Sequence, residues 1–355
     1  MFFLRRIIYL TFILSLIYSC AKISYIVEQG QGQWALIYQA RDNQEVLQDQ
    51  SVSQEIKEQI KKVESFKRFF YRYMDRPTTE IYSKTTFLKG EAVTHLVIAS
   101  PINQVKAYQE CFPLGGCFPY LGFFEHESAK RHALRLEKEH DLVTVIHPIY
   151  AYSTTGHLND PILSSFFRYK RKELAELIFH ELFHTILFIK DEVELNENLA
   201  TYVSQLLVTR YFKLTSKEQR ELERKNGASR ALSRRIVYLV KLLNQRYRQQ
   251  GVGVSSPAIA AQVLEHFLKE DFYPQIKDEC RKWQIDPKKC RPLHRQWNNA
   301  SFAAMMTYQS KGERIVKLHQ KLACSLPELV AYIEKQHQQY QELDSKDGFA
   351  DYLFK

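Results

Sequence analysis

Glycine and proline are scarce in this chain, with only 12 and 11 copies among 355 residues. The sequence also contains no glycine-rich phosphate loop, no internal repeat and no CxxC pair. These absences exclude a P-loop nucleotide-binding protein, a repeat array and a zinc site built from cysteine pairs. Hydrophobic residues make up 45% of the chain and recur mostly at helical spacing. The sequence therefore predicts an α+β fold that is predominantly helical.

The N-terminus lacks an apolar run long enough to span a membrane comfortably. Two arginines precede the apolar segment 7–17, which has the length typical of the hydrophobic part of an export signal. The next residues, Ile17-Tyr18-Ser19-Cys20, are similar to a lipobox that ends in the lipidated cysteine. We predict a signal peptide over residues 1–20 and a membrane-anchored lipoprotein of the cell envelope, lipidated at Cys20 and facing the periplasm or the cell surface. A cleaved secretory signal and an uncleaved anchor are the alternatives.

Charge of one sign is only modestly in excess. The chain has 50 lysines and arginines against 40 acidic residues, a net charge of +10. Much of the excess lies in residues 210–248, where basic residues alternate with glutamates and apolar residues, as on a solvated helix face. Together with the predicted export, this pattern argues against a nucleic-acid partner. Binding of these basic residues to anionic lipid headgroups is the alternative to a solvated helix face.

Five cysteines follow the predicted signal peptide, an odd number. Cys111 and Cys117 enclose a turn-rich Phe-Pro-Leu-Gly-Gly segment that could bring their sulfur atoms together. A second disulfide could form among Cys280, Cys290 and Cys324, which would leave one thiol free. Export permits both bridges. The alternative is that these cysteines are small, buried apolar residues.

The most informative segment is His180-Glu181-Leu182-Phe183-His184, an HExxH motif. Apolar residues dominate from Leu174 to Ile189, which predicts a buried helix that continues to a turn at Lys190–Glu192. On a helix, two histidines four residues apart share one face and can bind a single ion. Glu181 lies about 100° further round the helix, beside the ion, where it can accept a proton from water.

An open catalytic zinc site needs a third protein ligand. A second helical pattern follows the turn, and two antiparallel helices would place Glu197 level with His184, with axes about 8–10 Å apart. Glu194, one helical turn earlier, is the alternative third ligand. The alternative to any metal site is a core helix with two hydrogen-bonded histidines.

The chain upstream of the motif predicts a small sheet. Residues 92–99 and 142–147 are rich in β-branched residues and flank a charged amphipathic helix over 126–139. We expect these strands to form a sheet beside the HExxH helix, as in a zincin-like metallopeptidase. An edge strand of such a sheet can pair with the backbone of a peptide substrate.

Helical spacing dominates the rest of the chain. It covers most of residues 25–72 and 206–340. We therefore assign residues 21–340 to a single zincin-like metallopeptidase domain. Residues 341–355 are predicted to be a polar C-terminal tail.

A loop over residues 148–161 leads into the motif helix, and two of its side chains have chemistry suited to the site. Tyr152 could donate a hydrogen bond to a developing oxyanion, and Asp160 could orient a ligand histidine through its second ring nitrogen. Loop packing and helix capping are the alternatives for both residues. Tyr308 is a more distant candidate for the same oxyanion.

Short segments from about residue 25 to about residue 340 carry a resemblance to a known family. The most specific are the tyrosine-serine-threonine and asparagine-glutamate segments. The matching residues are Gly32-Gln33; Phe112-Pro113, Gly116, Tyr120 and Gly122-Phe123-Phe124; Ala151-Tyr152-Ser153-Thr154 with Asp160-Pro161-Ile162-Leu163; Phe179-His180-Glu181-Leu182; Asn196-Glu197 with Ala200; and Asn298-Asn299-Ala300. With these residues the chain resembles the bacterial predicted aminopeptidases, zincin-like lipoproteins of the gluzincin kind.

The resemblance implies a zinc metallopeptidase that hydrolyses peptides, with His180, His184 and Glu197 as zinc ligands and Glu181 as the catalytic base. The chain departs from the family pattern beside these residues, at Phe183, Thr185 and Asn198. It also lacks the Gly-x-Met-Glu-Asn segment with which gluzincin aminopeptidases hold the free amine of the substrate, so the removal of N-terminal residues is implied by the family alone. Two other functions stay open: a zinc amidase or deacylase acting on cell-wall or lipid material, and a lipoprotein without catalysis whose zinc is structural.

Overall fold

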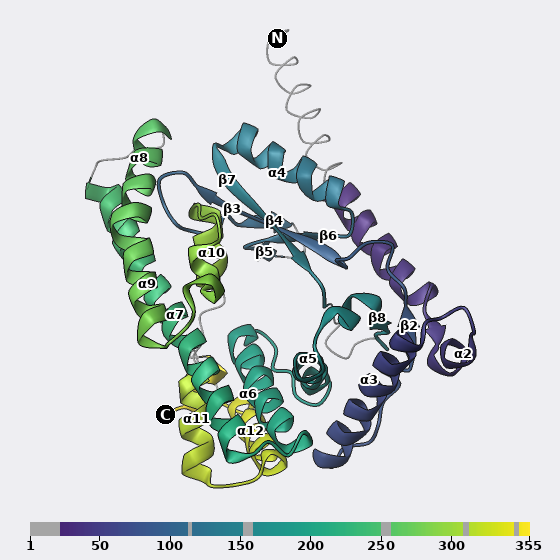
Figure 1. Cartoon of the computed structure of the whole chain (residues 1–355). Helices are drawn as coiled ribbons and strands as arrows, with labels where there is room; N and C mark the ends of the chain where they lie inside the picture. The colour runs from purple at the N-terminus through teal and green to yellow at the C-terminus, as the bar shows by residue number, and fades with distance from the viewer. Residues whose placement is uncertain (1–21, 113–115, 152–158, 250–256, 308–311, 344–347) are drawn as a thin grey trace.

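The computed structural model describes residues 22–112, 116–151, 159–249, 257–307, 312–343 and 348–355 (Figure 1). These parts are mostly helical with small sheets, which confirms the predicted helix-rich α+β fold. The helices are residues 22–38, α2 Asn43–Gln48, α3 Gln54–Tyr73, α4 His126–His140, α5 Arg171–His184, α6 Val193–Tyr211, α7 Ser216–Gln249, α8 Pro257–Phe267, α9 Tyr273–Lys282, α10 Asn299–Thr307, α11 Gly312–Leu322, α12 Leu326–Gln341 and α13 Phe349–Leu353. Within these ranges, none of the helices has the length and apolar character needed to cross a membrane.

The strands form two three-stranded sheets and one hairpin in the described ranges. The strands are β1 Arg41–Asp42, β2 Lys84–Thr86, β3 Thr94–Pro101, β4 Glu110–Phe112, β5 Gly116–Phe118, β6 Leu121–Phe123, β7 Leu142–Ile149 and β8 Ile162–Leu163. The sheet with the longest strands has the antiparallel order β6-β3-β7, with Leu96 of β3 opposite His147 of β7. β3 and β7 confirm the two predicted strands, and β7 lies at an edge of its sheet.

Two helices pack on this sheet. Val97, Ala99 and Leu142 from the strands and Leu136 from α4 belong to one buried cluster, so α4 covers one face. α10 packs against β3 and β7 as well, and Figure 1 shows α4 above the sheet and α10 below it. The sheet is therefore held between helices that are distant from one another in the sequence.

The main hydrophobic core surrounds α5. This helix lies between α3 and α6 (Figure 1), and its side chains Ile178, Phe179, Leu182 and Phe183 are fully buried. The ring of Phe179 meets that of Phe66 on α3 edge-on, with centroids 5.8 Å apart. A helix that is apolar nearly all round is typical of a core position. The core therefore fixes the backbone that carries the HExxH motif.

Two parts of the chain differ from the sequence prediction. Within 25–72, the stretch between the two helices contains β1 and the short α2, because Asp42 pairs in a strand and also caps α2 by accepting a hydrogen bond from a backbone N–H. The predicted polar tail over 341–355 includes α13, whose Phe349 and Leu353 are buried in the main core. In both places the structure depends on contacts with distant residues, and these contacts cannot be predicted from the local composition.

The structure contains the disulfides Cys111–Cys117 and Cys280–Cys290, and Cys324 is a free thiol. The first joins opposite residues of the β4–β5 hairpin, as the turn-rich segment predicted. The sequence left the second pairing open among three cysteines. Cys280 on α9 and Cys290 are each only 1% exposed, and both belong to a second core cluster that also contains Trp297.

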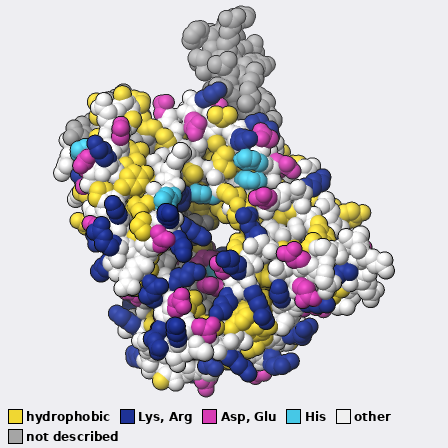
Figure 2. Space-filling view, in the orientation of Figure 1, with side chains coloured by type: hydrophobic (Ala, Val, Ile, Leu, Met, Phe, Trp, Pro, Cys, Tyr) yellow, Lys and Arg dark blue, Asp and Glu magenta, His cyan; other side chains and the backbone are white. Residues whose placement is uncertain are grey.

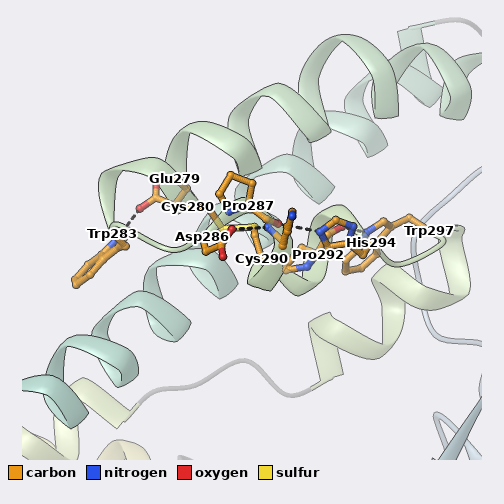
Figure 3. The surroundings of a disulfide bond; sticks show 10 residues. Glu279, Cys280, Trp283, Asp286, Pro287, Cys290, Pro292, His294 and Trp297 are labelled. Atoms are coloured by element: carbon orange, nitrogen blue, oxygen red, sulfur yellow. Dashed lines mark hydrogen bonds between the residues drawn. A yellow bond between two sulfur atoms is a disulfide. The ribbon is translucent and has the colours of Figure 1, made fainter.

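The surroundings of the second disulfide explain this pairing (Figure 3). Trp283 donates a hydrogen bond to the Glu279 carboxylate at 3.0 Å, and Trp297 donates to the carbonyl of Pro292 at 2.8 Å. His294 and the carbonyl of Pro287 are 2.8 Å apart. The chain itself turns back at the end of α9, where the backbone N–H of Ile285 donates to the carbonyl of Cys280 at 2.9 Å, and this turn brings Cys290 to Cys280.

Replacing both Cys280 and Cys290 by alanine is expected to lower the free energy of unfolding by about 2–4 kcal/mol, because the bridge restricts the unfolded chain. Chemical denaturation under oxidising conditions measures the loss. The double replacement of Cys111 and Cys117 is the matched control, and it should cost less because its six-residue spacing closes a shorter loop than the ten-residue spacing of the other pair. Unchanged stability of the first variant would contradict the prediction.

Candidate metal centre

Three side chains from α5 and α6 converge on one point. His180 and His184 lie on the same face of α5, and their Nε2 atoms are 3.3 Å apart. Glu197 of α6 faces both: one carboxylate oxygen is 3.3 Å from His180 Nε2 and the other is 3.4 Å from His184 Nε2. The predicted antiparallel return of the chain therefore brings Glu197, and not the alternative Glu194, to the two histidines.

The spacing of these atoms fits a metal ion. Ligand atoms bonded at zinc distances in a tetrahedron lie about 3.3–3.4 Å from one another, and the usual length of an N–H···O hydrogen bond is shorter. The three contacts match the tetrahedral spacing, and the candidate ligand atoms all lie within 4.8 Å of one another. Two imidazoles and a carboxylate are also ligands that suit zinc. His180, His184 and Glu197 therefore form a group that could hold a metal ion.

The group is buried on one side and open on the other. The His184 side chain is 3% exposed, that of His180 is 20% exposed, and that of Glu197 is 48% exposed. Figure 2 shows a hollow at the centre of the visible face, between the sheet-bearing part of the molecule and the helices below it. Acidic side chains are visible inside the hollow, and lysines and arginines surround it. A ligand bound by these three residues would therefore be in contact with solvent.

The protonation of the three groups is coupled through their charges. Burial lowers the pKa of His180, but the hydrogen bond to Glu197 and the carboxylate of Glu181 outweigh it and raise this pKa above 6.5. Burial, followed by the charge of His180, lowers the pKa of His184 to about 4. Burial acts to raise the pKa of Glu197, but the neighbouring histidines hold it below its usual value. The two opposite shifts therefore favour a proton on the His180 imidazole over the Glu197 carboxylate, while His184 is neutral near neutral pH.

Zinc binding is expected to release protons near neutral pH, because the metal must displace the proton that the raised pKa favours on His180. The pKa of His180 is raised, so the affinity for zinc should fall as the pH is lowered through that pKa. Calorimetric titrations in buffers of different ionisation enthalpy measure the release. A binding enthalpy that does not depend on the buffer at pH 6.5 would mean that His180 is already deprotonated, against this prediction.

The end of α5 is fixed by a contact with α3. α5 ends at His184, five residues before the predicted limit at Ile189. The hydroxyl of Thr185 donates to the carbonyl of Leu182 at 2.7 Å, so it accepts from the hydroxyl of Tyr71, which is 3.0 Å away. Tyr71 is almost fully buried. The helix therefore stops directly after the second histidine, at a point held by a residue 114 positions earlier.

Asn196 holds the loop between the two helices. Its side chain is buried, accepts a hydrogen bond from the backbone N–H of Ile189 at 3.0 Å and donates to the carbonyl of the same residue at 2.7 Å. Asp191 in this loop adopts a left-handed backbone with φ of 64°, which an aspartate tolerates in a tight turn. Because Asn196 directly precedes Glu197, these two hydrogen bonds fix the position of Glu197 on the first turns of α6 relative to the loop. The sequence singled out Asn196 only through the family resemblance.

The C-terminus also contacts this loop. The Glu192 carboxylate accepts a hydrogen bond from the backbone N–H of Ala350 at 2.9 Å, and a side chain on Gly348 would come within 2.9 Å of the same carboxylate oxygen. α13 therefore packs directly beside the turn that orients α6. No feature of the polar C-terminal sequence indicated this contact.

Of the second ring nitrogens of the two histidines, that of His180 has a distant partner and that of His184 has none. The hydroxyl of Thr201, one turn after Glu197 on α6, is 3.5 Å from His180 Nδ1, and His184 Nδ1 is buried without a hydrogen-bond partner. Asp160 is buried, and its backbone carbonyl accepts a hydrogen bond from Tyr82. An orienting contact between the Asp160 carboxylate and a ligand histidine stays a prediction.

Glu181 lies beside the group, as its place on the helix predicted. Its charge acts to raise the pKa of His180 and also that of two tyrosines, Tyr82 and Tyr169. Tyr82 is fully buried, whereas Tyr169 is partly exposed. Three residues of the sequence prediction lie outside the described residues: Cys20, Tyr152 and Tyr308.

The asparagine pair singled out by the resemblance connects the sheet to the helices. Asn298 donates to the carbonyl of Thr144 on β7 at 3.0 Å, and Asn299 donates to the carbonyl of Pro101 at the end of β3 at 2.9 Å. Arg295 contacts His147 of β7 at 2.6 Å. The segment before α10 thus lies along part of the β7 edge, and pairing of this edge with a substrate stays a prediction.

These features define a class of protein. The helix-rich α+β fold holds the HExxH helix in its core. The next helix brings a glutamate to the two histidines, and the three side chains form a partly exposed group that could hold a metal ion. The model of a family described as "Putative aminopeptidase" matches residues 24–346, nearly the whole chain. The chain therefore belongs to the putative aminopeptidase family, and the predicted resemblance is confirmed. No curated protein and no solved structure matches the chain.

Proposed function

We propose that this chain is a zinc-dependent peptidase of the zincin-like kind that removes residues from the free N-terminus of peptides. It would act in the cell envelope, anchored through a lipid on Cys20. The family supports the peptidase and the substrate class. The observation that carries the proposal is the mutual 3.3–3.4 Å spacing of the His180, His184 and Glu197 ligand atoms beside Glu181.

The reaction assigns a role to each of these side chains. Zinc held by His180, His184 and Glu197 would supply Lewis acidity and make water a better nucleophile. Glu181 would accept the proton of the attacking water and deliver it to the nitrogen of the leaving amine. Tyr152 is the proposed donor to the oxyanion, and Tyr308 is the more distant candidate.

The exposure of the group favours catalysis over a structural role. A structural zinc site is closed by four protein ligands, whereas a catalytic site has three and leaves a position for water and substrate. Only three candidate ligands converge here within the described parts of the chain, and the Glu197 side chain is 48% exposed. This arrangement supports the enzyme over the alternative of a lipoprotein with a structural zinc.

A comparison of matched substrates tests the proposal. Peptide reporters with a free N-terminal amine should be hydrolysed at least ~100-fold faster than the same reporters with an acetylated amine. When the amine is blocked, the polar groups of the enzyme that would bind it are left without partners. Reporters that release acyl or sugar-linked groups should not react. Cleavage of the acetylated peptides at an equal rate would assign an endopeptidase, and release of acyl groups alone would assign the amidase or deacylase.

A further inference from the structure

The N-terminal helix, residues 22–38, exposes an unusual amount of apolar surface. Thirteen large hydrophobic side chains are exposed in the described parts of the chain, and six of them lie on these seventeen residues. The six are Ile23 (56% exposed), Ile26 (58%), Val27 (49%), Trp34 (66%), Ile37 (37%) and Tyr38 (76%). Single exposed apolar residues are normal, but a concentration of this kind marks an interaction surface. We call these six residues the apolar stripe.

The spacing of the apolar stripe places it on one side of the helix. Ile23, Ile26 and Val27 have the spacing i, i+3, i+4, and Trp34, Ile37 and Tyr38 repeat it. Trp34 follows Val27 by seven residues, or two helical turns, with Gly30 between them. The rings of Trp34 and Tyr38 stack with centroids 5.8 Å apart. The helix carries just two charged residues, Lys22 and Glu28, and neither belongs to the stripe. The stripe is therefore continuous, uncharged and about 25 Å long, at 1.5 Å per residue.

The opposite side of the helix is packed against the protein. Gln29 donates to the carbonyl of Gly122 on β6 at 2.9 Å, and Leu36 is buried in the main core. A side chain on Gly32 would clash with the ring of Phe124, so the helix and the segment after β6 meet closely. The fold thus fixes the helix through one side and leaves the apolar stripe pointing away from the molecule.

The sequence before the helix identifies what covers the stripe. The apolar segment 7–17 and Cys20 directly precede the helix, and Ile23 follows Cys20 by three residues. Three extended residues span about 10 Å, so an anchor at or before Cys20 would hold the start of the stripe at the membrane surface. Helices that lie in the membrane interface bury an apolar face about 5–10 Å deep, often with aromatic residues at the headgroup level.

Basic residues adjoin the same end of the helix. A cavity of about 220 Å³ is lined by Lys22, Arg131 and Arg135, together with Glu28, Glu110 and His132. Lys22 donates to the carbonyl of Cys111 at 2.6 Å, which holds it at this position. Lys22, Arg131 and Arg135 thus place positive charge beside the start of the stripe, where it would be attracted to the anionic headgroups of phospholipids.

We propose that the apolar stripe of the N-terminal helix lies in the interfacial region of an anionic bilayer, as a second membrane contact beside the N-terminal anchor. The anchor alone would leave the domain free to rotate. The stripe fixes its orientation, because the helix is packed against the sheet and core through its other side. This inference rests on the proposed N-terminal anchor but not on the peptidase activity, so it can hold or fail independently of that activity.

Trp34 is a natural probe for this contact, because it belongs to the stripe and the chain has only two other tryptophans. The full-length chain would be reconstituted in vesicles of anionic phospholipid whose acyl chains are brominated near the headgroup. Tryptophan emission should be quenched relative to vesicles without bromine. Trp34→Phe should lose that quenching, because Trp297 is 7% exposed and Trp283 packs on Gly227 of α7. Absence of quenching in the wild type, or its retention in Trp34→Phe, overturns the proposal.

A charged variant separates the stripe from the anchor. Ile23→Glu combined with Ile26→Glu should abolish the quenching of Trp34 while the chain stays attached to the vesicles. Leu134→Glu on α4 is the matched control, because Leu134 is also exposed, at 52%, but is not part of the stripe; it should keep the quenching. Quenching that persists in the double variant overturns the proposal. Trp34 emission that is shifted to the blue without quenching would instead mean that a second copy of the chain covers the stripe, and also overturns it.

Discussion

Glu181→Gln is expected to lower turnover by at least about 10²–10⁴-fold while metal content stays at the wild-type level. Glutamine has nearly the same shape but cannot accept a proton from water at neutral pH. Glu181 is not one of the three converging ligand atoms, so its loss should leave their geometry intact. Steady-state hydrolysis of a free-amine peptide, with metal content measured on the same sample by mass spectrometry, gives both quantities.

Glu173→Gln is the control for this prediction. Glu173 carries the same charge on the same helix, but it is exposed in the first turn, where its carboxylate accepts a hydrogen bond from the backbone N–H of Lys170. This variant should keep the wild-type rate. Turnover near the wild-type level in Glu181→Gln would remove Glu181 from the mechanism, and loss of metal in that variant would assign it to binding the ion.

Glu197→Ala should abolish stable zinc binding. The wild type should bind about one zinc per chain, and zinc at 100 times its dissociation constant should raise the free energy of unfolding by about 2.7 kcal/mol. The variant should show neither at the same zinc concentration, because one of three ligands is gone and the two histidines remain. Metal analysis after dialysis and thermal unfolding with and without zinc measure the two effects.

Glu194→Ala is the matched control, because it removes a carboxylate one turn earlier on the same helix that does not converge with the histidines. It should retain zinc and the stabilisation. Equal zinc retention by Glu197→Ala and the wild type would move the third ligand elsewhere, and a wild type that binds no zinc would remove the basis of the proposed enzyme. Loss of zinc in both variants would show that the geometry of α6, and not one carboxylate, controls the site.

The local sequence was sufficient for the parts of the site that depend on periodicity. The two histidines of the HExxH motif share a helix face because of their spacing, and the apolar residues around them made α5 a core helix. The turn after α5 was visible in Lys190–Glu192, and Glu197 followed at a distance that suits an antiparallel return. Glu194 was the competing choice, and only the tertiary structure decided between the two.

Long-range contacts decided what periodicity left open. The apolar pattern continues to Ile189, but α5 ends at His184, where Thr185 hydrogen-bonds to Tyr71 on another helix. Three cysteines could have formed the second disulfide, and the fold of the chain around α9 selected Cys280 and Cys290. Such contacts join residues far apart in the sequence, and the pattern around either residue does not encode them.

By itself, then, the sequence determined the helix that carries His180, Glu181 and His184, the main strands and the family. Each of these depends on residue spacing or on short motifs, which can be recognised in the sequence without knowledge of the fold. Only the tertiary structure decided that Asn196 clamps the loop before Glu197, that Phe349 is buried in the core, and that the stripe of the N-terminal helix points outwards. Burial is a property of how distant segments meet, so the same apolar residue can belong to the core or to a surface.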